Sequence, residues 1–179
     1  MEKTELLSFI SKYSLGGNVE SVTWELKDNS ITTNFVSSDK TLKGTVTMNS
    51  AAIDSSLPEI GIYTTSQLVR MVSILDSDIS VSVNNTSMQV NDKYTNFSFV
   101  LADLDVIPKS PKLKMTPSFT STIKITDDFI NKFVKSHGAL PDNDVFTIEG
   151  DAISKQIIFG YSNTNSNRIS FNIDIDGED

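Results

Sequence analysis

The chain has 179 residues and a formal net charge of −8, and 38% of its residues are hydrophobic. This composition is typical of a globular protein, and the length suffices for one or two domains. The absence of Cys excludes disulfides and thiolate metal sites, and the single histidine, His137, excludes His-rich metal sites. No apolar run approaches the roughly 20 residues of a membrane span, and the N-terminus lacks signal-peptide features. We therefore expect a cytoplasmic protein without a membrane partner.

Residues 3–13 are predicted to form a short helix, because apolar residues recur there at helical spacing. The residues expected on its buried face are Leu6, Phe9, Ile10 and Tyr13. Three segments with alternating apolar and polar residues follow at 21–28, 30–38 and 41–49. This period-two pattern is typical of strands with one buried face, so a helix lying on a sheet is expected.

The same order of elements follows a second time. A predicted strand at 59–64 leads into a helix at 65–75, and three further strands are predicted at 78–85, 87–92 and 95–103. The residues expected on the buried face of this helix are Leu68, Met71, Val72 and Leu75.

A third copy of the pattern begins with a predicted strand at 119–125 and a helix at 127–136, with Thr126 as its N-cap. The residues expected on the buried face of this helix are Ile130, Phe133 and Val134. Three strands are predicted to follow, at 144–151, 155–162 and 168–176. The strand-helix-three-strand repeat therefore recurs at intervals of about 60 residues.

The segment 103–117 separates the second and third repeats. It contains three of the five prolines and has no periodic pattern, which indicates an extended connector. The predicted organisation is a first domain at 1–105, a connector at 106–118 and a second domain at 119–179, which holds a single repeat. The predicted fold class is α+β, with antiparallel sheets and with the helices on one face.

The outward faces of the three predicted helices share a chemical character. Residues 3–13, 65–75 and 127–137 carry five basic and three acidic residues, a balance of +2 in a chain of net charge −8. The basic residues are Lys3, Lys12, Arg70, Lys132 and Lys135. The simpler interpretation of each helix alone is a solvated face whose charges suit the helix dipole. Together, the three faces would form a basic strip suited to sequence-independent contact with phosphates.

The acidic C-terminal end was considered as a metal site. Its carboxylates are Asp174, Asp176, Glu178 and Asp179. They lack the spacing of an EF-hand loop, so no metal and no cofactor is expected. His137 has no identifiable nucleophile and orienting acid around it, and therefore no enzyme activity is predicted either.

The order of these segments resembles the DNA sliding clamps, the polymerase processivity factors, and most of all those of T-even-type tailed phages. The resemblance rests on residues 6–14, 20–39, 60–85 and 95–108 for the first domain, and on 120–139 with 146–163 for the second. It implies a clamp fold with two repeats per domain and helices lining a ring. A subunit with two such domains would have four repeats. This sequence contains three, and in that respect it departs from the pattern.

The resemblance further implies a homotrimeric ring that encircles duplex DNA and tethers the replicative DNA polymerase, with a clamp loader as a further partner. In that case Lys3, Lys12, Arg70, Lys132 and Lys135 would face the DNA. Clamp partners dock a peptide tail into an apolar pocket beside the connector. The candidates for this pocket are Leu42, Val106, Ile107 and Pro108, although the connector residues are equally expected to attach the connector to the core.

The alternative hypothesis is an all-β viral structural protein of the virion, since Cys-free chains rich in Ser, Thr and Asn are common in that class. A helix with a basic outer face in every repeat favours the clamp.

Overall fold

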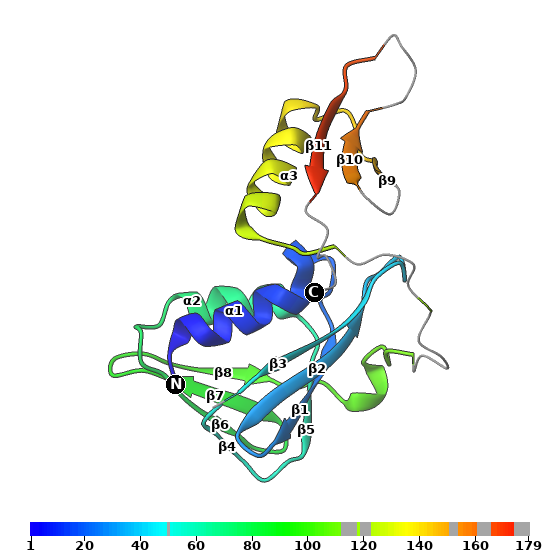
Figure 1. The fold of residues 1–179 in the computed structure, drawn as a ribbon. Helices are drawn as coiled ribbons and strands as arrows, with labels where there is room; N and C mark the ends of the chain where they lie inside the picture. The colour runs from blue at the N-terminus through cyan, green and yellow to red at the C-terminus, as the bar shows by residue number, and fades with distance from the viewer. Residues whose placement is uncertain (50, 112–117, 119–122, 151–153, 161–165, 174–179) are drawn as a thin grey trace. The chain divides into compact units, whose positions relative to one another are not determined.

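A computed structural model describes residues 1–49, 51–111, 118, 123–150, 154–160 and 166–173. The chain forms two compact units, Met1–Leu113 and Lys114–Asp179, which we call the N-terminal and C-terminal units (Figure 1).

Among its described residues, the N-terminal unit contains two helices and two sheets of four strands each. The helices are α1 (Lys3–Ser14) and α2 (Thr65–Ser73), with short 3-10 turns at Leu15–Gly17 and Leu104–Val106. The first sheet has the order β3-β2-β1-β5, and its strands are β1 (Val22–Lys27), β2 (Ser30–Val36), β3 (Lys43–Met48) and β5 (Glu59–Ile62). The second has the order β4-β6-β7-β8, and its strands are β4 (Ile53–Ser55), β6 (Ser80–Val83), β7 (Ser87–Asn91) and β8 (Asn96–Val100).

The predicted repeats are joined through their strands. β5, the strand that begins the second repeat, pairs antiparallel with β1 of the first. All other ladders of this unit are antiparallel except β4 with β6, which is parallel. β4 was not predicted, because its three residues are too few for a recognisable alternation.

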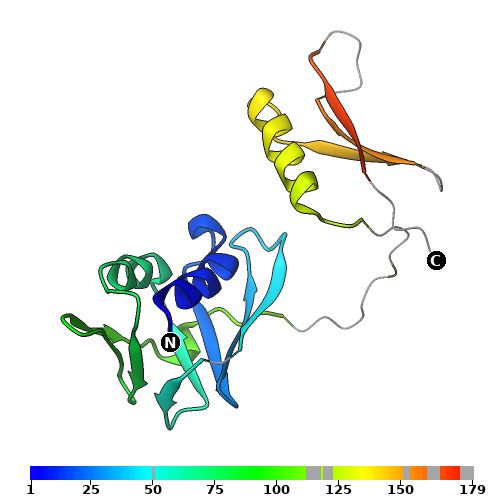
Figure 2. The same cartoon turned by 60° about the vertical axis from the view of Figure 1, so that its left-hand side comes forward.

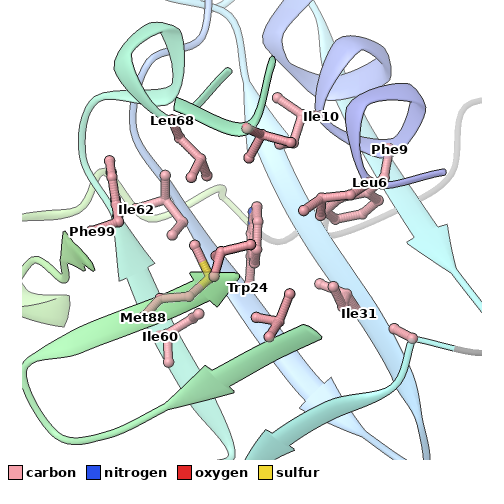
Figure 3. Packing of buried hydrophobic residues seen from close by; sticks show 14 of the residues in the cluster. Leu6, Phe9, Ile10, Trp24, Ile31, Ile60, Ile62, Leu68, Met88 and Phe99 are labelled. Carbon is pink, nitrogen blue, oxygen red and sulfur yellow. The ribbon is translucent and has the colours of Figure 1, made fainter. Parts of the chain in front are cut away.

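One hydrophobic core joins both helices to both sheets. Trp24 on β1 lies at its centre and is fully buried, with the ring of Phe9 packed edge-to-face at 5.4 Å (Figure 3). The ring of Tyr13 also packs edge-to-face on Trp24, at 6.5 Å. The buried faces predicted for the first two helices are confirmed for Leu6, Ile10, Leu68 and others, while Met71 is half-buried. Burial of these side chains supplies the stability that such short helices lack on their own.

The C-terminal unit contains α3 (Asp127–Ala139) on one face of a three-stranded antiparallel sheet (Figure 1). Its strands are β9 (Phe146–Gly150), β10 (Lys155–Phe159) and β11 (Ile169–Ile173), in the order β11-β10-β9. The Thr126 side chain caps α3 as predicted, because its Oγ1 accepts a hydrogen bond from Phe129 N at 3.2 Å. The core of this unit consists mainly of Ile157, Phe159 and Ile173.

The predicted buried face of the third helix is wrong for two of its three residues. Ile130 and Val134 are 47% and 62% exposed, and Phe129 and Phe133 pack on the sheet instead. Phe129 packs edge-to-face on Phe171 of β11 with the ring centroids 6.0 Å apart, and Phe133 packs on Phe159 of β10 at 5.0 Å, so the aromatic side chains of the helix face the sheet. Phe129 and Phe133 are four residues apart and therefore share one helical stripe, which is the one that packs on the sheet.

The strand predicted at 119–125 is not present in the part that can be described. Residues 119–122 lie outside the described residues, and 123–125 form no strand. The same limit applies to the ends of the strands predicted at 144–151, 155–162 and 168–176.

Candidate nucleic-acid interface

The two helices of the N-terminal unit lie side by side on the same side of its sheets (Figures 1 and 2). Their apolar stripes face the core, and their polar faces point away from it. Because both helices are held by the same core, their outward faces form one continuous surface of fixed shape.

On α1, the two predicted lysines have different surroundings. Lys12, in the last turn, is exposed. Lys3 is half-buried, and its ammonium donates a hydrogen bond to the carbonyl of Leu75 beyond the end of α2. Its backbone N–H also donates to Ser77 O at 2.7 Å. Lys3 therefore joins α1 to the segment that follows α2, while Lys12 has its charge available at the surface.

On α2, the exposed residues that face outward are Ser66, Arg70 and Ser73. The carboxylate of Glu20 accepts a hydrogen bond from Ser66 N at 2.9 Å, at the first turn of the helix. A helix N-terminus attracts anions, and here Glu20 already fills that position. Any phosphate contact on this helix would consequently fall on the Arg70 guanidinium.

The hydroxyl groups between the basic residues are bonded to their own helices. Ser11 Oγ donates to Ser8 O at 2.9 Å, and Ser73 Oγ donates to Val69 O at 2.6 Å. Within the part of the chain that the structure describes, neither Lys12 nor Arg70 takes part in an ion pair. The surface thus presents the charges of Lys12 and Arg70. The serine hydroxyls between them are hydrogen-bonded to carbonyl groups of their own helices.

α3 carries the other two predicted cations on the C-terminal unit. Lys132 Nζ lies 2.8 Å from a carboxylate oxygen of Asp128, one helical turn earlier. Both side chains are more than half exposed, so this ion pair is worth well under about 1 kcal/mol. Lys135 is exposed. The outward face of α3 therefore has a smaller excess of positive charge than its lysines alone suggest.

The turn between β7 and β8 contains a carboxylate with a defined role. Asp92 accepts hydrogen bonds from the backbone N–H groups of Asp76, Tyr94 and Thr95, at 2.6, 2.7 and 2.6 Å. These bonds, that from Asp76 foremost, lower the pKa of Asp92 below its usual value. The anion ties the end of α2 to the β7–β8 hairpin.

A surface groove lies where the connector passes the first sheet. Its volume is about 620 Å³. Residues from β1, β2, β3 and β5 line one side, and residues from the connector line the other. The lining residues are Thr23, Glu25, Asn34, Lys43, Glu59, Leu104, Asp105, Pro108, Lys109 and Ser110. The groove is largely polar, in contrast to the apolar pocket predicted beside the connector.

The segment between β8 and the connector is held to the sheet by a close backbone approach at Ala102. Ala102 N donates to Gly61 O at 2.9 Å, and a Cβ on Gly61 would lie 2.5 Å from Ala102 O. Only glycine therefore fits on β5 at this point. Ile107, 3% exposed, packs over the same glycine.

The four residues predicted for the partner pocket do not all line this groove. Pro108 lines the groove, and Ile107 is buried against the body of the unit. Leu42 and Val106 are 44% and 59% exposed but are not among the lining residues. The sequence analysis did not predict the polar strand residues that line the groove. They occupy the solvent-facing positions of strands with an alternating pattern, and that pattern could have identified them.

No metal centre is found where the structure can be described. Among those residues, no group of three or more His, Asp or Glu is arranged to hold an ion. The four C-terminal carboxylates considered above lie outside the described residues. None of the described helices has the length and hydrophobicity needed to cross a membrane.

Comparison with solved structures identifies the fold. The chain is similar to the proliferating cell nuclear antigen (PCNA) of Thermococcus kodakaraensis, with a TM-score of 0.68 and 12% identity over 95% of this chain and 69% of that one. The PCNA of Entamoeba histolytica gives a TM-score of 0.57 and 12% identity over 98% of this chain and 75% of that one. The DnaN sliding clamp of Bartonella birtlesii gives 0.58 and 12% over 88% of this chain and 45% of that one.

The chain therefore has the α+β sliding-clamp fold, as predicted. It spans about half of the bacterial clamp and about seven-tenths of the PCNA chains. No family model matches the sequence, and no curated protein matches it either. At such low identity, the likeness concerns the fold.

Proposed function

We propose that the protein is a sliding clamp, a non-enzymatic ring that encircles duplex DNA and tethers the replicative DNA polymerase. The observation that carries the proposal is the surface of α1 and α2, where Lys12 and Arg70 present available charges on a clamp fold of net charge −8. An enclosed duplex needs only weak contacts, because topology prevents its escape. A few cations suffice, and the acidic remainder of the surface disfavours adsorption of DNA elsewhere.

The DNA-facing set in this proposal is Lys3, Lys12, Arg70, Lys132 and Lys135. The available charges of Lys12, Arg70 and Lys135 are expected to contribute most. Lys3 contributes least, since its ammonium is bonded to Leu75 O. Lys132 shares its charge with Asp128.

The test is charge reversal at two helices, Arg70→Glu with Lys132→Glu. We expect shorter products per binding event in primer extension and a salt slope of duplex binding that falls by roughly 1 for each lost phosphate contact. The matched control reverses two exposed lysines of hairpins, Lys27→Glu at the end of β1 with Lys93→Glu in the β7–β8 turn. Equal processivity in the wild type and the helix variant, both folded, would refute the DNA-facing assignment.

The groove beside the connector is proposed as the site for the polymerase tail, with Pro108 as its contact residue and Leu42, Val106 and Ile107 as the neighbouring apolar side chains. Pro108→Glu should weaken binding of the purified polymerase of the same organism in surface plasmon resonance, because it adds a charge to the groove. Ser56→Glu, at an exposed site in the β4–β5 loop, is the control. Unchanged affinity in both variants would exclude the groove.

The remaining parts of this proposal come from the resemblance. They are a ring of several copies, for which a homotrimer is implied, loading by a clamp loader, an origin in a T-even-type bacteriophage and a place in the host cytoplasm. A virion protein, the alternative, would neither enclose duplex DNA nor extend polymerase products. Clamp-dependent extension on a circular primed template therefore distinguishes the two functions.

A further inference from the structure

Two polar atoms in the core of the N-terminal unit are buried without a hydrogen bond. They are the indole nitrogen Nε1 of Trp24 and the hydroxyl oxygen Oγ1 of Thr33, and neither has a partner in the part of the chain that the structure describes. Both residues are 0% exposed, and Trp24 lies at the centre of the core (Figure 3). Burial of an unpaired polar group costs stability, because folding removes the water that it bonds in the unfolded chain.

The two residues are neighbours across the β1–β2 ladder. Trp24 lies directly opposite Thr33 in this antiparallel pair. Their side chains therefore leave the sheet on the same face, with the Cβ atoms about 4.5–5.5 Å apart. On its other side Thr33 is paired with Val46 of β3, which offers no polar side-chain atom. The two unpaired atoms thus belong to adjacent side chains, and one ligand between them can bond both.

The chemistry of the two atoms limits what this ligand can be. The indole N–H only donates a hydrogen bond, whereas the threonine hydroxyl donates one and accepts others. The ligand must therefore accept a bond from the indole, which excludes a cation. An anion would bring an uncompensated charge into the core. A small neutral molecule with both donor and acceptor capacity remains, and water is the one that a closed core most readily holds.

The phenol of Tyr13 is the other polar group beside the indole. Its hydroxyl is already paired with that of Thr65 at 3.2 Å. Burial raises the pKa of Tyr13 to about 12, and the hydrogen bond with Thr65 and the nearby Trp24 indole oppose this rise. The indole therefore lies near the phenol, but Trp24 Nε1 makes no hydrogen bond to it. The indole N–H is left with a need for an acceptor.

We propose that one water molecule is bound inside the core between Trp24 and Thr33. Its oxygen accepts a hydrogen bond from Trp24 Nε1, and the same water is hydrogen-bonded to Thr33 Oγ1. Two polar partners suffice for a buried water, and the space that it needs is about 30 Å³. The bridge fixes the rotation of the indole ring, on which Phe9 of α1 packs at 5.4 Å. It thereby helps to hold α1 on the sheet.

Urea unfolding of the full chain tests this site, because a bound water and an unpaired hydroxyl predict opposite signs. Thr33→Val removes the hydroxyl and keeps the shape of the side chain. With a water bound, the equilibrium constant of unfolding should rise roughly fivefold. Thr23→Val, the same change on the other face of β1, is the control and should stay within about twofold of the wild type. A Thr33→Val variant as stable as the wild type, or more stable, would overturn the proposal.

NMR of the indole proton tests the other end of the bridge. Trp24 is the only tryptophan, so the spectrum contains a single indole N–H signal. In the wild type this proton should show a cross-peak with bound water, which Thr33→Val should abolish and Tyr13→Phe should leave in place. If only Tyr13→Phe changed the signal, the indole would donate directly to the phenol, and the water site would be refuted. This site is independent of DNA binding, so its failure would leave the proposed clamp function standing.

Discussion

The hydroxyl groups of Tyr13 and Thr65 lie 3.2 Å apart and join α1 to the first residue of α2. Both residues are fully buried, so this is a polar contact within the apolar core. A buried hydrogen bond is directional, whereas apolar packing is not, and the pair therefore fixes how the two helices sit beside each other. The surface that carries Lys12 and Arg70 depends on that arrangement.

Removal of the phenol hydroxyl tests the contact. Tyr13→Phe should lower the free energy of unfolding by about 1–2 kcal/mol, because it deletes the bond and leaves the Thr65 hydroxyl buried without it. Urea unfolding followed by tryptophan fluorescence is a suitable measurement, since Trp24 lies in the same cluster. Tyr63→Phe, at a 55% exposed tyrosine, should change the free energy by less than about 0.5 kcal/mol. Equal effects of the two substitutions would contradict the assigned role.

The same residue predicts an alkaline limit to stability. Burial raises the pKa of Tyr13 from 10.0 to about 12, against the weaker opposing effect of the hydrogen bond with Thr65. Between these two pKa values the unfolded chain loses a proton that the folded chain keeps, so the folded state loses stability as pH rises from 10 toward 12. Stability curves of the wild type and Tyr13→Phe at pH 9 and 11.5 should converge at the higher pH. A constant difference between them would contradict the assignment.

Asp92 predicts an acid limit at the other end of α2. Its lowered pKa means that its three backbone hydrogen bonds stabilise the fold above its ordinary value of 3.8, and that this contribution is lost as pH falls through the folded-state pKa. Asp92→Asn should lower the melting temperature by a few degrees at pH 7 and by less at pH 2.5. Asp54→Asn, at an exposed aspartate on β4, is the control. The same difference at both pH values would show that the carboxylate charge is not involved.

Periodicity predicts local structure in this chain well, because each element presents one apolar face to a core. The three helices and most strands were predicted for that reason. The pairing of β5 with β1 connects residues far apart in the chain, and no local pattern encodes it. The rotation of α3 follows from ring packing between Phe129 and Phe171 of β11, which is also a non-local contact.

In the candidate site, too, local spacing predicts some features, whereas others depend on contacts between distant residues. The exposure of Lys12 and Arg70 follows from helical spacing, since each lies opposite the apolar stripe of its helix. The hydrogen bond of Lys3 to Leu75 O joins residues 72 positions apart, and spacing could not reveal it. The groove is lined by strands and connector together, and of the four residues predicted for the partner pocket its lining includes Pro108.

Two glycine substitutions should act in opposite directions. In Gly61→Ala the added Cβ would lie 2.5 Å from the backbone oxygen of Ala102, so the connector must move away from β5. We expect a loss of about 1–3 kcal/mol in unfolding free energy. We also expect faster proteolysis within the connector, because Ile107 would no longer pack against residue 61. The control is Gly138→Ala in α3, where nothing lies within 4 Å of the added Cβ.

At Gly138, alanine only reduces the freedom of the unfolded chain and raises helix propensity. A gain of about 0.5–1 kcal/mol is expected, with unchanged proteolysis of the connector. Urea unfolding and limited trypsin digestion of both variants make the comparison. If Gly61→Ala were as stable and as protease-resistant as the wild type, this contact would not hold the connector. The position of the connector residues that line the groove would then depend on other contacts.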